Sequence, residues 1–343
     1  MNKSNNKITC QFCFYVLSFY FTIFLSGLYA DELKEISTFK ITAGGQEPLS
    51  IATDGSYIYY LWSADSGAHV SRYTMSGQKI STFDITAGGQ EPLSIASDRS
   101  YIYYLWADES GAHVSRYTMS GQKISAFDIT AGGQWPISIA TDGSYIYYLW
   151  ADESGTHVSR YTMSGHKISA FDITAGGQEP LSIASDKSYI YYLWADESGT
   201  HVSRYTMSGQ KISAFDITAG GQEPLSIATD GSSIYYLWAV ESGTHVSRYT
   251  MSGQEILTFD IAAGGHGSLS IATDGAYIYY MRVVESGTYV SRYYNSFRAS
   301  PVKMPFSPNS RTTSITSITT TAPAYQTPLP PAIILRENKQ GRQ

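Results

Sequence analysis

The chain is poor in cysteine, in charge and in helical patterning. Only Cys10 and Cys13 occur among its 343 residues, so beyond residue 13 neither a disulfide framework nor thiol chemistry is available. Charged residues make up 15% and the net charge is −6, which argues against sequence-independent nucleic-acid binding, because such binding needs a basic face. No long segment shows the apolar spacing of about 3.6 residues that marks an amphipathic helix. These absences favour an all-β protein whose core alone stabilises it.

One long apolar run is present, at residues 12–28, and it follows an N-terminal segment that contains Lys3 and Lys7. It leads to the small residue Ala30, just before Asp31, which is the order of a secretory signal peptide. We therefore expect residues 1–30 to be removed and the mature chain to be secreted or held at the cell surface or in the periplasm, without a membrane span. An uncleaved anchor is the alternative, because the run is near the upper length for a signal.

A pattern of 44 residues is written six times between residues 36 and 296, without insertion or deletion. Tryptophan holds one position in five copies, and Arg282 holds it in the sixth. These tryptophans are Trp62, Trp106, Trp150, Trp194 and Trp238. A period of about 20–50 residues indicates stacked units, none of which buries its apolar surface alone.

Each copy contains four strand-length runs separated by turn residues. In the copy that begins at Lys167 they are residues 167–173, 180–186, 188–194 and 201–207, which alternate in polarity or are aromatic and β-branched. Four short antiparallel strands, repeated six times, predict an all-β, six-bladed β-propeller. A solenoid is the alternative architecture.

The two ends of the repeat region favour a closed ring. Residues 36–41 have the sequence of a fourth strand with no blade before them, and the last copy stops after its third strand, at Tyr294. Pairing the two completes the sixth blade and removes an exposed edge. We predict a signal peptide at 1–30, the propeller at 31–296, and a Ser/Thr/Pro-rich tail at 297–343 that is disordered.

The repeat resembles two known families. Residues 46–60 read Gln-Glu-Pro-Leu-Ser-Ile-Ala-Thr-Asp-Gly-Ser-Tyr-Ile-Tyr-Tyr, and Val-Ser-Arg-Tyr and Ser-Gly follow. This is similar to the NHL repeat and to the YWTD repeat of low-density-lipoprotein receptors, and the similarity covers residues 36–296. It implies a six-bladed propeller. Leu-Trp stands where those families have an acidic residue after the second strand's tyrosine.

The expected binding surface is the face that carries the long connections, since loops on a rigid scaffold carry function. The tryptophan series belongs there, either as wedges between blades or as contacts for a sugar or a protein partner. Trp135 replaces a glutamate in the third blade alone and is the best single candidate for an exposed contact. A histidine recurs in five blades, at His69, His113, His157, His201 and His245, and Tyr289 takes this position in the sixth.

Metal and cofactor binding are not expected. One histidine per blade, at the blade tops, does not converge on a metal site, although it permits a pH-dependent surface. Calcium binding by the acidic loop at Asp65 and its equivalents is disfavoured, because each loop offers few carboxylates.

An aspartate and an arginine also recur in every blade, and we expect a direct charge-assisted bond between them that pins the turn. The aspartates are Asp54, Asp98, Asp142, Asp186, Asp230 and Asp274. The arginines are Arg72, Arg116, Arg160, Arg204, Arg248 and Arg292.

Near-identical blades argue against catalysis, which needs different residues in different roles at one point. The first strands carry small residues such as Ser50 and Ala52 toward the axis. We therefore expect a monomeric, non-catalytic protein that binds protein or glycan partners. The alternatives are a lactonase-like hydrolase or lyase with an axial metal, and a structural spacer without a ligand. Recent duplication would also make the blades alike.

Overall fold

The computed structural model describes residues 35–41, 47–85, 91–129, 135–173, 179–217, 223–241, 243–261 and 268–295. All of them belong to the compact unit Met1–Arg298. The expected signal peptide and tail lie outside these ranges, as do the residues between successive blades, such as 42–46, each of which contains a Gly-Gly pair. Within them every regular element is a β-strand, and no helix is present that could cross a bilayer.

Each blade is a four-stranded antiparallel sheet whose strands follow in chain order. The first complete blade contains β2 (Glu47–Thr53), β3 (Tyr57–Ala64), β4 (Gly67–Thr74) and β5 (Lys79–Asp84). The second and third blades contain β6 (Glu91–Ser97), β7 (Tyr101–Asp108), β8 (Gly111–Thr118), β9 (Lys123–Asp128), β10 (Trp135–Thr141), β11 (Tyr145–Asp152), β12 (Gly155–Thr162) and β13 (Lys167–Asp172). The fourth and fifth contain β14 (Glu179–Ser185), β15 (Tyr189–Asp196), β16 (Gly199–Thr206), β17 (Lys211–Asp216), β18 (Glu223–Thr229), β19 (Ser233–Val240), β20 (Gly243–Thr250) and β21 (Glu255–Ile261).

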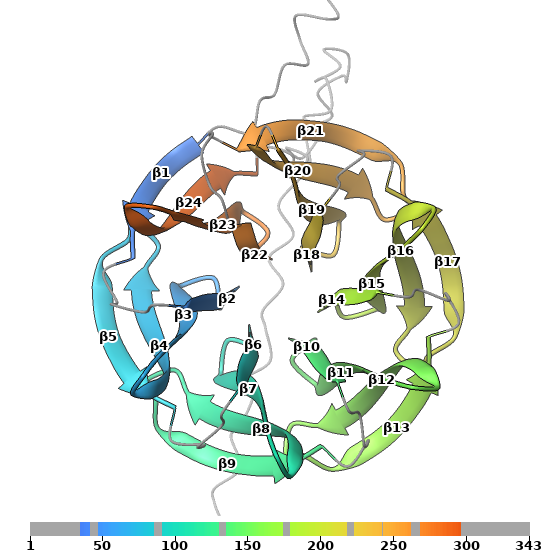
Figure 1. Cartoon of the computed structure of the whole chain (residues 1–343), viewed down its shortest axis with the longest axis horizontal. Helices are drawn as coiled ribbons and strands as arrows, with labels where there is room; N and C mark the ends of the chain where they lie inside the picture. Colours follow the sequence, from blue (N-terminus) through green and yellow to red (C-terminus); the bar gives the residue numbers. More distant parts are fainter. Residues whose placement is uncertain are drawn as a thin grey trace, which may run out of the picture. The chain divides into compact units, whose positions relative to one another are not determined.

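The sixth blade closes the ring with the N-terminal strand. It has the order β1-β24-β23-β22, made by β1 (Glu35–Lys40), β22 (Ser268–Thr273), β23 (Tyr277–Val284) and β24 (Gly287–Tyr294). The backbone N–H of Ile41 donates to the carbonyl of Thr288 at 2.8 Å and continues this pairing. The predicted six-bladed propeller and its closing strand are therefore confirmed. Figure 1 shows the six sheets around a central axis, with β2, β6, β10, β14, β18 and β22 innermost.

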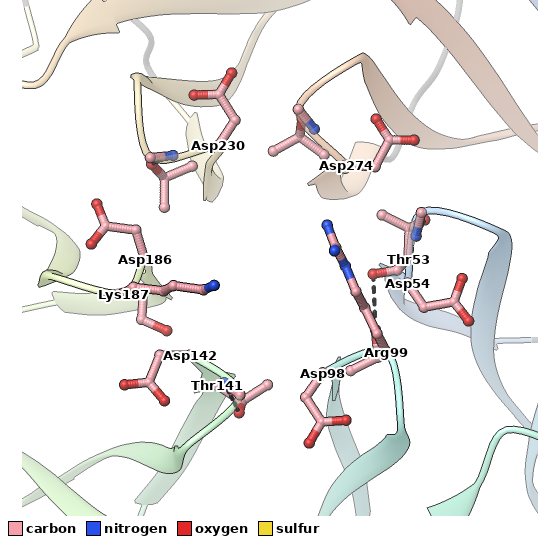
Figure 2. A pocket seen from close by; sticks show the side chains of 18 of the residues that line it. Thr53, Asp54, Asp98, Arg99, Thr141, Asp142, Asp186, Lys187, Asp230 and Asp274 are labelled. Carbon is pink, nitrogen blue, oxygen red and sulfur yellow. Dashed lines mark hydrogen bonds between the residues drawn. The ribbon is translucent and has the colours of Figure 1, made fainter. Parts of the chain in front are cut away.

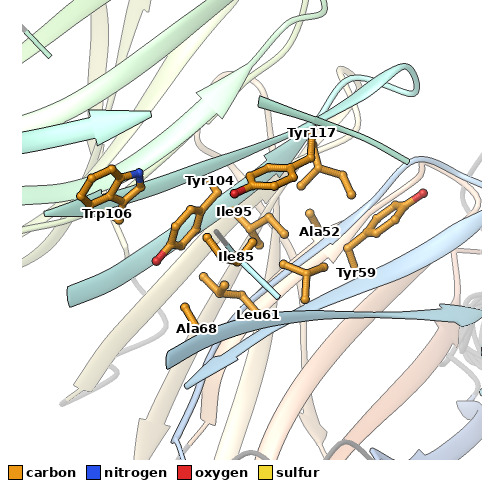
Figure 3. Close-up of a cluster of buried hydrophobic side chains, with 11 residues drawn as sticks. Ala52, Tyr59, Leu61, Ala68, Ile85, Ile95, Tyr104, Trp106 and Tyr117 are labelled. Carbon is orange, nitrogen blue, oxygen red and sulfur yellow. The ribbon is translucent and has the colours of Figure 1, made fainter. Parts of the chain in front are cut away.

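The apolar core lies between neighbouring blades. One cluster joins Tyr59 and Leu61 of the first complete blade to Tyr104, Trp106 and Tyr117 of the next (Figure 3). The second strand of each blade is almost continuously buried, because a neighbouring sheet covers each of its faces. This explains why its sequence is aromatic and aliphatic throughout and does not alternate.

A close approach between blades requires a glycine at the turn after the third strand in five blades. Gly121, in the turn after β8, has φ +92°, and a Cβ there would lie 2.3 Å from the ring of Phe83 in the preceding blade. The outer strand of one blade thus packs against the turn of the next. A side chain at this position would push the two blades apart.

Candidate functional site

The ring has two faces with different connections. We call the end that holds the β3–β4 turns and the connections from one blade to the next the long-loop face. The opposite end, which holds the β2–β3 and β4–β5 turns and their equivalents, is the short-turn face. Residues 42–46 and their equivalents, which belong to the long connections expected at this face, lie outside the described residues.

The repeated tryptophans lie near the long-loop face but are buried. Trp62 stacks on His69 with ring centres 4.2 Å apart, and its Nε1 donates to the hydroxyl of Ser71 at 3.0 Å. The equivalent indoles have the same neighbours, and all five of this series are only 7–8% exposed. Trp62 also packs with Met281 and Val290 of the sixth blade. This geometry favours the wedge role for the series over direct stacking on a ligand.

The repeated histidines link strands within five of the blades at this face. Nδ1 of His113 lies 2.8 Å from an oxygen of Asp128, and Nε2 lies 3.1 Å from both Asp108 and the hydroxyl of Ser110. His157 and His201 have the same partners in their own blades. The Ser110 hydrogen bonds, followed by His113, hold the pKa of Asp108 below its usual value. Each histidine therefore orders carboxylates that reach the surface.

Those carboxylates give the long-loop face a strongly acidic character. Four outer strands end with Asp84, Asp128, Asp172 and Asp216, and Asp260 is the next-to-last residue of β21. The side chains of these five residues are 78–87% exposed. The inner strands begin with Glu47, Glu91, Glu179 and Glu223. The β3–β4 turns and their equivalents add Asp65, Glu109, Glu153, Glu197, Glu241 and Glu285. In the described part of the chain, the basic residues of this face are Lys40 and Arg282.

Trp135 breaks the glutamate series at the inner rim. It is the first residue of β10, pairs in register with Ala151, and is 53% exposed. An exposed indole at the inner end of a blade offers an apolar surface inside an acidic ring. The structure thus separates Trp135 from the five buried tryptophans, as its sequence position predicted.

The recurrent aspartate and arginine do not pair directly as expected. Oδ1 of Asp54 accepts the backbone N–H groups of Ser56 and Tyr57, and Oδ2 accepts the hydroxyl of Tyr59, all at 2.7 Å. The guanidinium of Arg72 stacks on the Tyr57 ring at 4.8 Å and donates to the carbonyl of Met119 at 2.8 Å.

The prediction of a direct bond was therefore wrong, because the aspartate is used by its own turn while five of the arginines reach a methionine carbonyl of the next blade. Arg248 instead donates to the hydroxyl of Ser233 in its own blade. Both residues remain structural. One caps the β2–β3 turn, and the other ties adjacent blades together.

A cavity of about 650 Å³ lies on the axis at the short-turn face. The turns that follow the innermost strands line it, and Figure 2 shows Arg99 and Lys187 pointing into it. Sequence reasoning did not single out these two residues. The sequence signal that could have identified them is that each replaces the glycine of the Asp-Gly turn found in the other four blades. No group of three or more His, Cys, Asp or Glu side chains that could hold a metal ion occurs in the described ranges.

Comparisons with known proteins establish the fold and no family. No family model and no curated protein matches the sequence. The PQQ-bound aldose sugar dehydrogenase of Streptomyces coelicolor is similar, with a TM-score of 0.54, 13% identity, and coverage of 77% of this chain and 98% of that one. BamB of Moraxella catarrhalis is similar with a TM-score of 0.46 and 10% identity, over 78% of this chain and 98% of the other. At such identities the likeness concerns the fold alone.

Proposed function

We propose that this protein is an exported, non-catalytic binding protein that engages protein or glycan partners through its long-loop face. The observation that carries the proposal is the histidine-ordered acidic network, which recurs around the ring with nearly the same distances. The proposal includes a monomeric mature chain that begins after residue 30, and a repeat of the NHL or YWTD type.

The acidic charge favours a protein partner with a basic surface. A face lined by one sign of charge attracts oppositely charged partners and raises their association rate. Each exposed carboxylate contributes little by itself, because solvent screens it. Similar sites in successive blades add through avidity when the partner presents several cationic groups at matching spacing.

Trp135 favours a glycan as the second candidate. An exposed indole supplies a flat apolar surface, and the neighbouring inner-rim carboxylates supply hydrogen-bond acceptors. Because only the third blade carries this tryptophan, such a glycan contact would occur once per ring. It would therefore lack the avidity that the acidic network offers.

The similarity between blades is the argument against catalysis. The His113, His157 and His201 networks use equivalent partners at nearly the same distances. Catalysis requires groups with distinct roles that meet at one point. Equivalent networks spaced around a ring are suited to repeated contact.

The test is to immobilise the mature chain, residues 31–343, and to probe it with extracellular proteins and with a glycan array. A charge-neutral variant, Asp84→Asn with Asp128→Asn and Asp172→Asn, removes three exposed carboxylates from the long-loop face. We expect the wild type to retain a defined basic protein at low salt and to release it at high salt, since exposed charges are screened. The variant should retain far less of it.

The matched control removes three charges from the opposite face, as Lys79→Gln with Lys123→Gln and Lys167→Gln. Retention should be unchanged in this control. Glycan binding that is lost in Trp135→Glu supports the second candidate instead. The proposal is overturned if the lysine variant loses retention of the basic protein, or if the wild type binds neither a protein nor a glycan.

A further inference from the structure

The axial cavity of the short-turn face has the dimensions of a small-molecule site. Its volume of about 650 Å³ lies within the range of roughly 300–1,000 Å³ that is usual for ligand pockets. A ring of hydroxyl-bearing residues from the ends of the inner strands lines it: Thr53, Ser97, Thr141, Ser185, Thr229 and Thr273. A smaller hollow of about 150 Å³ adjoins it, lined by alanines, by Ile51 and Ile227 and by the same six hydroxyl-bearing residues. Arg99 and Lys187 line only the larger cavity, which is therefore the candidate site for a charged ligand.

Two blades place a cation where the others have glycine. The turn residue after the aspartate is Gly55, Gly143, Gly231 or Gly275 in four blades, and it is Arg99 or Lys187 in the remaining two. Both side chains line the cavity and point toward its centre (Figure 2). Neither head group has a hydrogen-bond or ion-pair partner among the residues that the structure describes.

The backbone at Arg99 is strained. Its φ is +75°, and no other non-glycine residue of the described chain has a positive φ. The glycines at the same turn position have φ between +81° and +88°. Left-handed backbone is unfavourable for a residue with a Cβ. A side chain kept in such a conformation, and aimed into a cavity, indicates a functional constraint.

The aspartates of these turns do not neutralise the two cations. Asp98 accepts hydrogen bonds from the N–H groups of Ser100 and Tyr101 and from the hydroxyl of Tyr103. Its carboxylate, like the other five, points away from the centre of the cavity (Figure 2). Each blade also contributes one arginine of its third strand near this end, such as Arg116 over the Tyr101 ring. The charge that faces the cavity without a partner is therefore positive.

We propose that this cavity binds a small ligand through an oxyanion, a phosphate or a carboxylate. Arg99 offers several N–H donors in a planar fork, and Lys187 offers a second, mobile cation from two blades away. The ring hydroxyls of Thr53, Ser97, Thr141, Thr229 and Thr273 already donate to backbone carbonyls, so the two cations are the donors that the cavity offers to a ligand. The site goes beyond the proposed function, because it lies on the opposite face and uses residues that occur once each.

The experiment is calorimetric titration of the mature chain with inorganic phosphate and, separately, with citrate, which distinguishes the two ligand sources. Arg99→Gly and Lys187→Gly give each turn the glycine that four other blades carry, so both variants are expected to fold. Lys123→Gln is the matched control, because it removes one positive charge from the outer rim of the same face and leaves the cavity intact.

We expect at least one probe to bind the wild type. Each single glycine variant should weaken that binding by about tenfold, since a charge-assisted contact is removed, and the double variant should abolish it. The Lys123→Gln chain should bind as the wild type does. The proposal is overturned if neither probe binds, or if binding survives in the double glycine variant or falls equally in the lysine control.

Discussion

The two faces of this ring differ in charge and in regularity. The long-loop face carries exposed carboxylates that recur from blade to blade, each ordered by a histidine. The short-turn face carries the turn aspartates together with an equal set of third-strand arginines, and in addition Arg99, Lys187 and the lysines that begin four outer strands. The residues that repeat in the blades therefore form an acidic surface with several similar sites at one end. The two residues that depart from the repeat, Arg99 and Lys187, add positive charge at a single site at the other end.

This difference shows how to interpret a repeat protein whose copies are nearly identical. Positions that stay constant, such as Asp54 and Arg72, maintain turns and blade contacts. Positions that change in one or two blades are not needed to maintain a turn or a contact between blades. Trp135, Arg99 and Lys187 are such positions, and all three are exposed at the axial ends of the ring.

The largest expected effect distinguishes the buried tryptophans from the exposed one. Trp150→Ala should lower the free energy of unfolding by about 3–5 kcal/mol, since it empties a site between two blades. Trp135→Ala should change it by no more than about 0.5 kcal/mol, as for an exposed residue. Urea denaturation of both variants measures this. Equal losses would place the two tryptophans in the same environment, contrary to the structure.

Alkaline pH should lower the stability of the whole ring. Burial, as the main cause, raises the pKa of Tyr60 to about 12 and raises the pKa of Tyr59 above its usual value, the latter also through its bond to Asp54. A raised pKa in the folded state gives stability that is complete below about pH 10, the unfolded value, and that is lost as the pH rises further. Tyrosines of every blade share this shift, so the thermal midpoint should fall steeply from about pH 10 to 12.

The measurement is the thermal midpoint by circular dichroism between pH 8 and 12. A midpoint that stays constant across this range would contradict the burial of these phenols. Tyrosine ionisation, followed by ultraviolet absorbance on the same samples, should lag behind that of free tyrosine until unfolding begins.

A smaller effect concerns the turn at the short-turn face. Arg99→Gly should raise the free energy of unfolding by about 1–2 kcal/mol, because it relieves a left-handed backbone. Gly143→Ala, at φ +85° in the equivalent turn, should lower it by a similar amount. Chemical denaturation should show changes of opposite sign in the free energy of unfolding of the two variants. A loss of stability in Arg99→Gly would show that the arginine is held for structure and not for a ligand.

The smallest effect is expected for Trp135→Glu, which makes the third blade match its neighbours. The substitution introduces the residue that starts four other inner strands, so stability should stay within about 0.5 kcal/mol of the wild type. Glycan binding, where the array detects it, should disappear. Persistence of glycan binding in this variant would move the glycan contact away from the inner rim.

The sequence was sufficient to predict the ring. The 44-residue period, the strand-like runs and the unpaired N-terminal strand led to six blades closed by β1, because these features depend on local polarity and on a count of strands. The isolated tryptophan at position 135 was also visible as a departure from the repeat.

The details of the site depended on geometry that a sequence does not contain. Asp54 and Arg72 were expected to pair, but the turn places two backbone N–H groups closer to the carboxylate, and the blade twist directs the arginine to the carbonyl of Met119. Arg99 and Lys187 are far apart in the chain. Only closure of the ring brings their turns around one cavity.

The central claim is that the acidic long-loop face and the Arg99–Lys187 pair mark separate binding sites on opposite faces. The most direct measurement is calorimetric binding of the Asp84→Asn, Asp128→Asn, Asp172→Asn variant and of the Arg99→Gly, Lys187→Gly double variant, each titrated with the basic protein and with the oxyanion that bind the wild type. We predict that the first variant loses only the protein and that the second loses only the oxyanion. A variant that loses both ligands, or a pair of variants that loses neither, would contradict the claim.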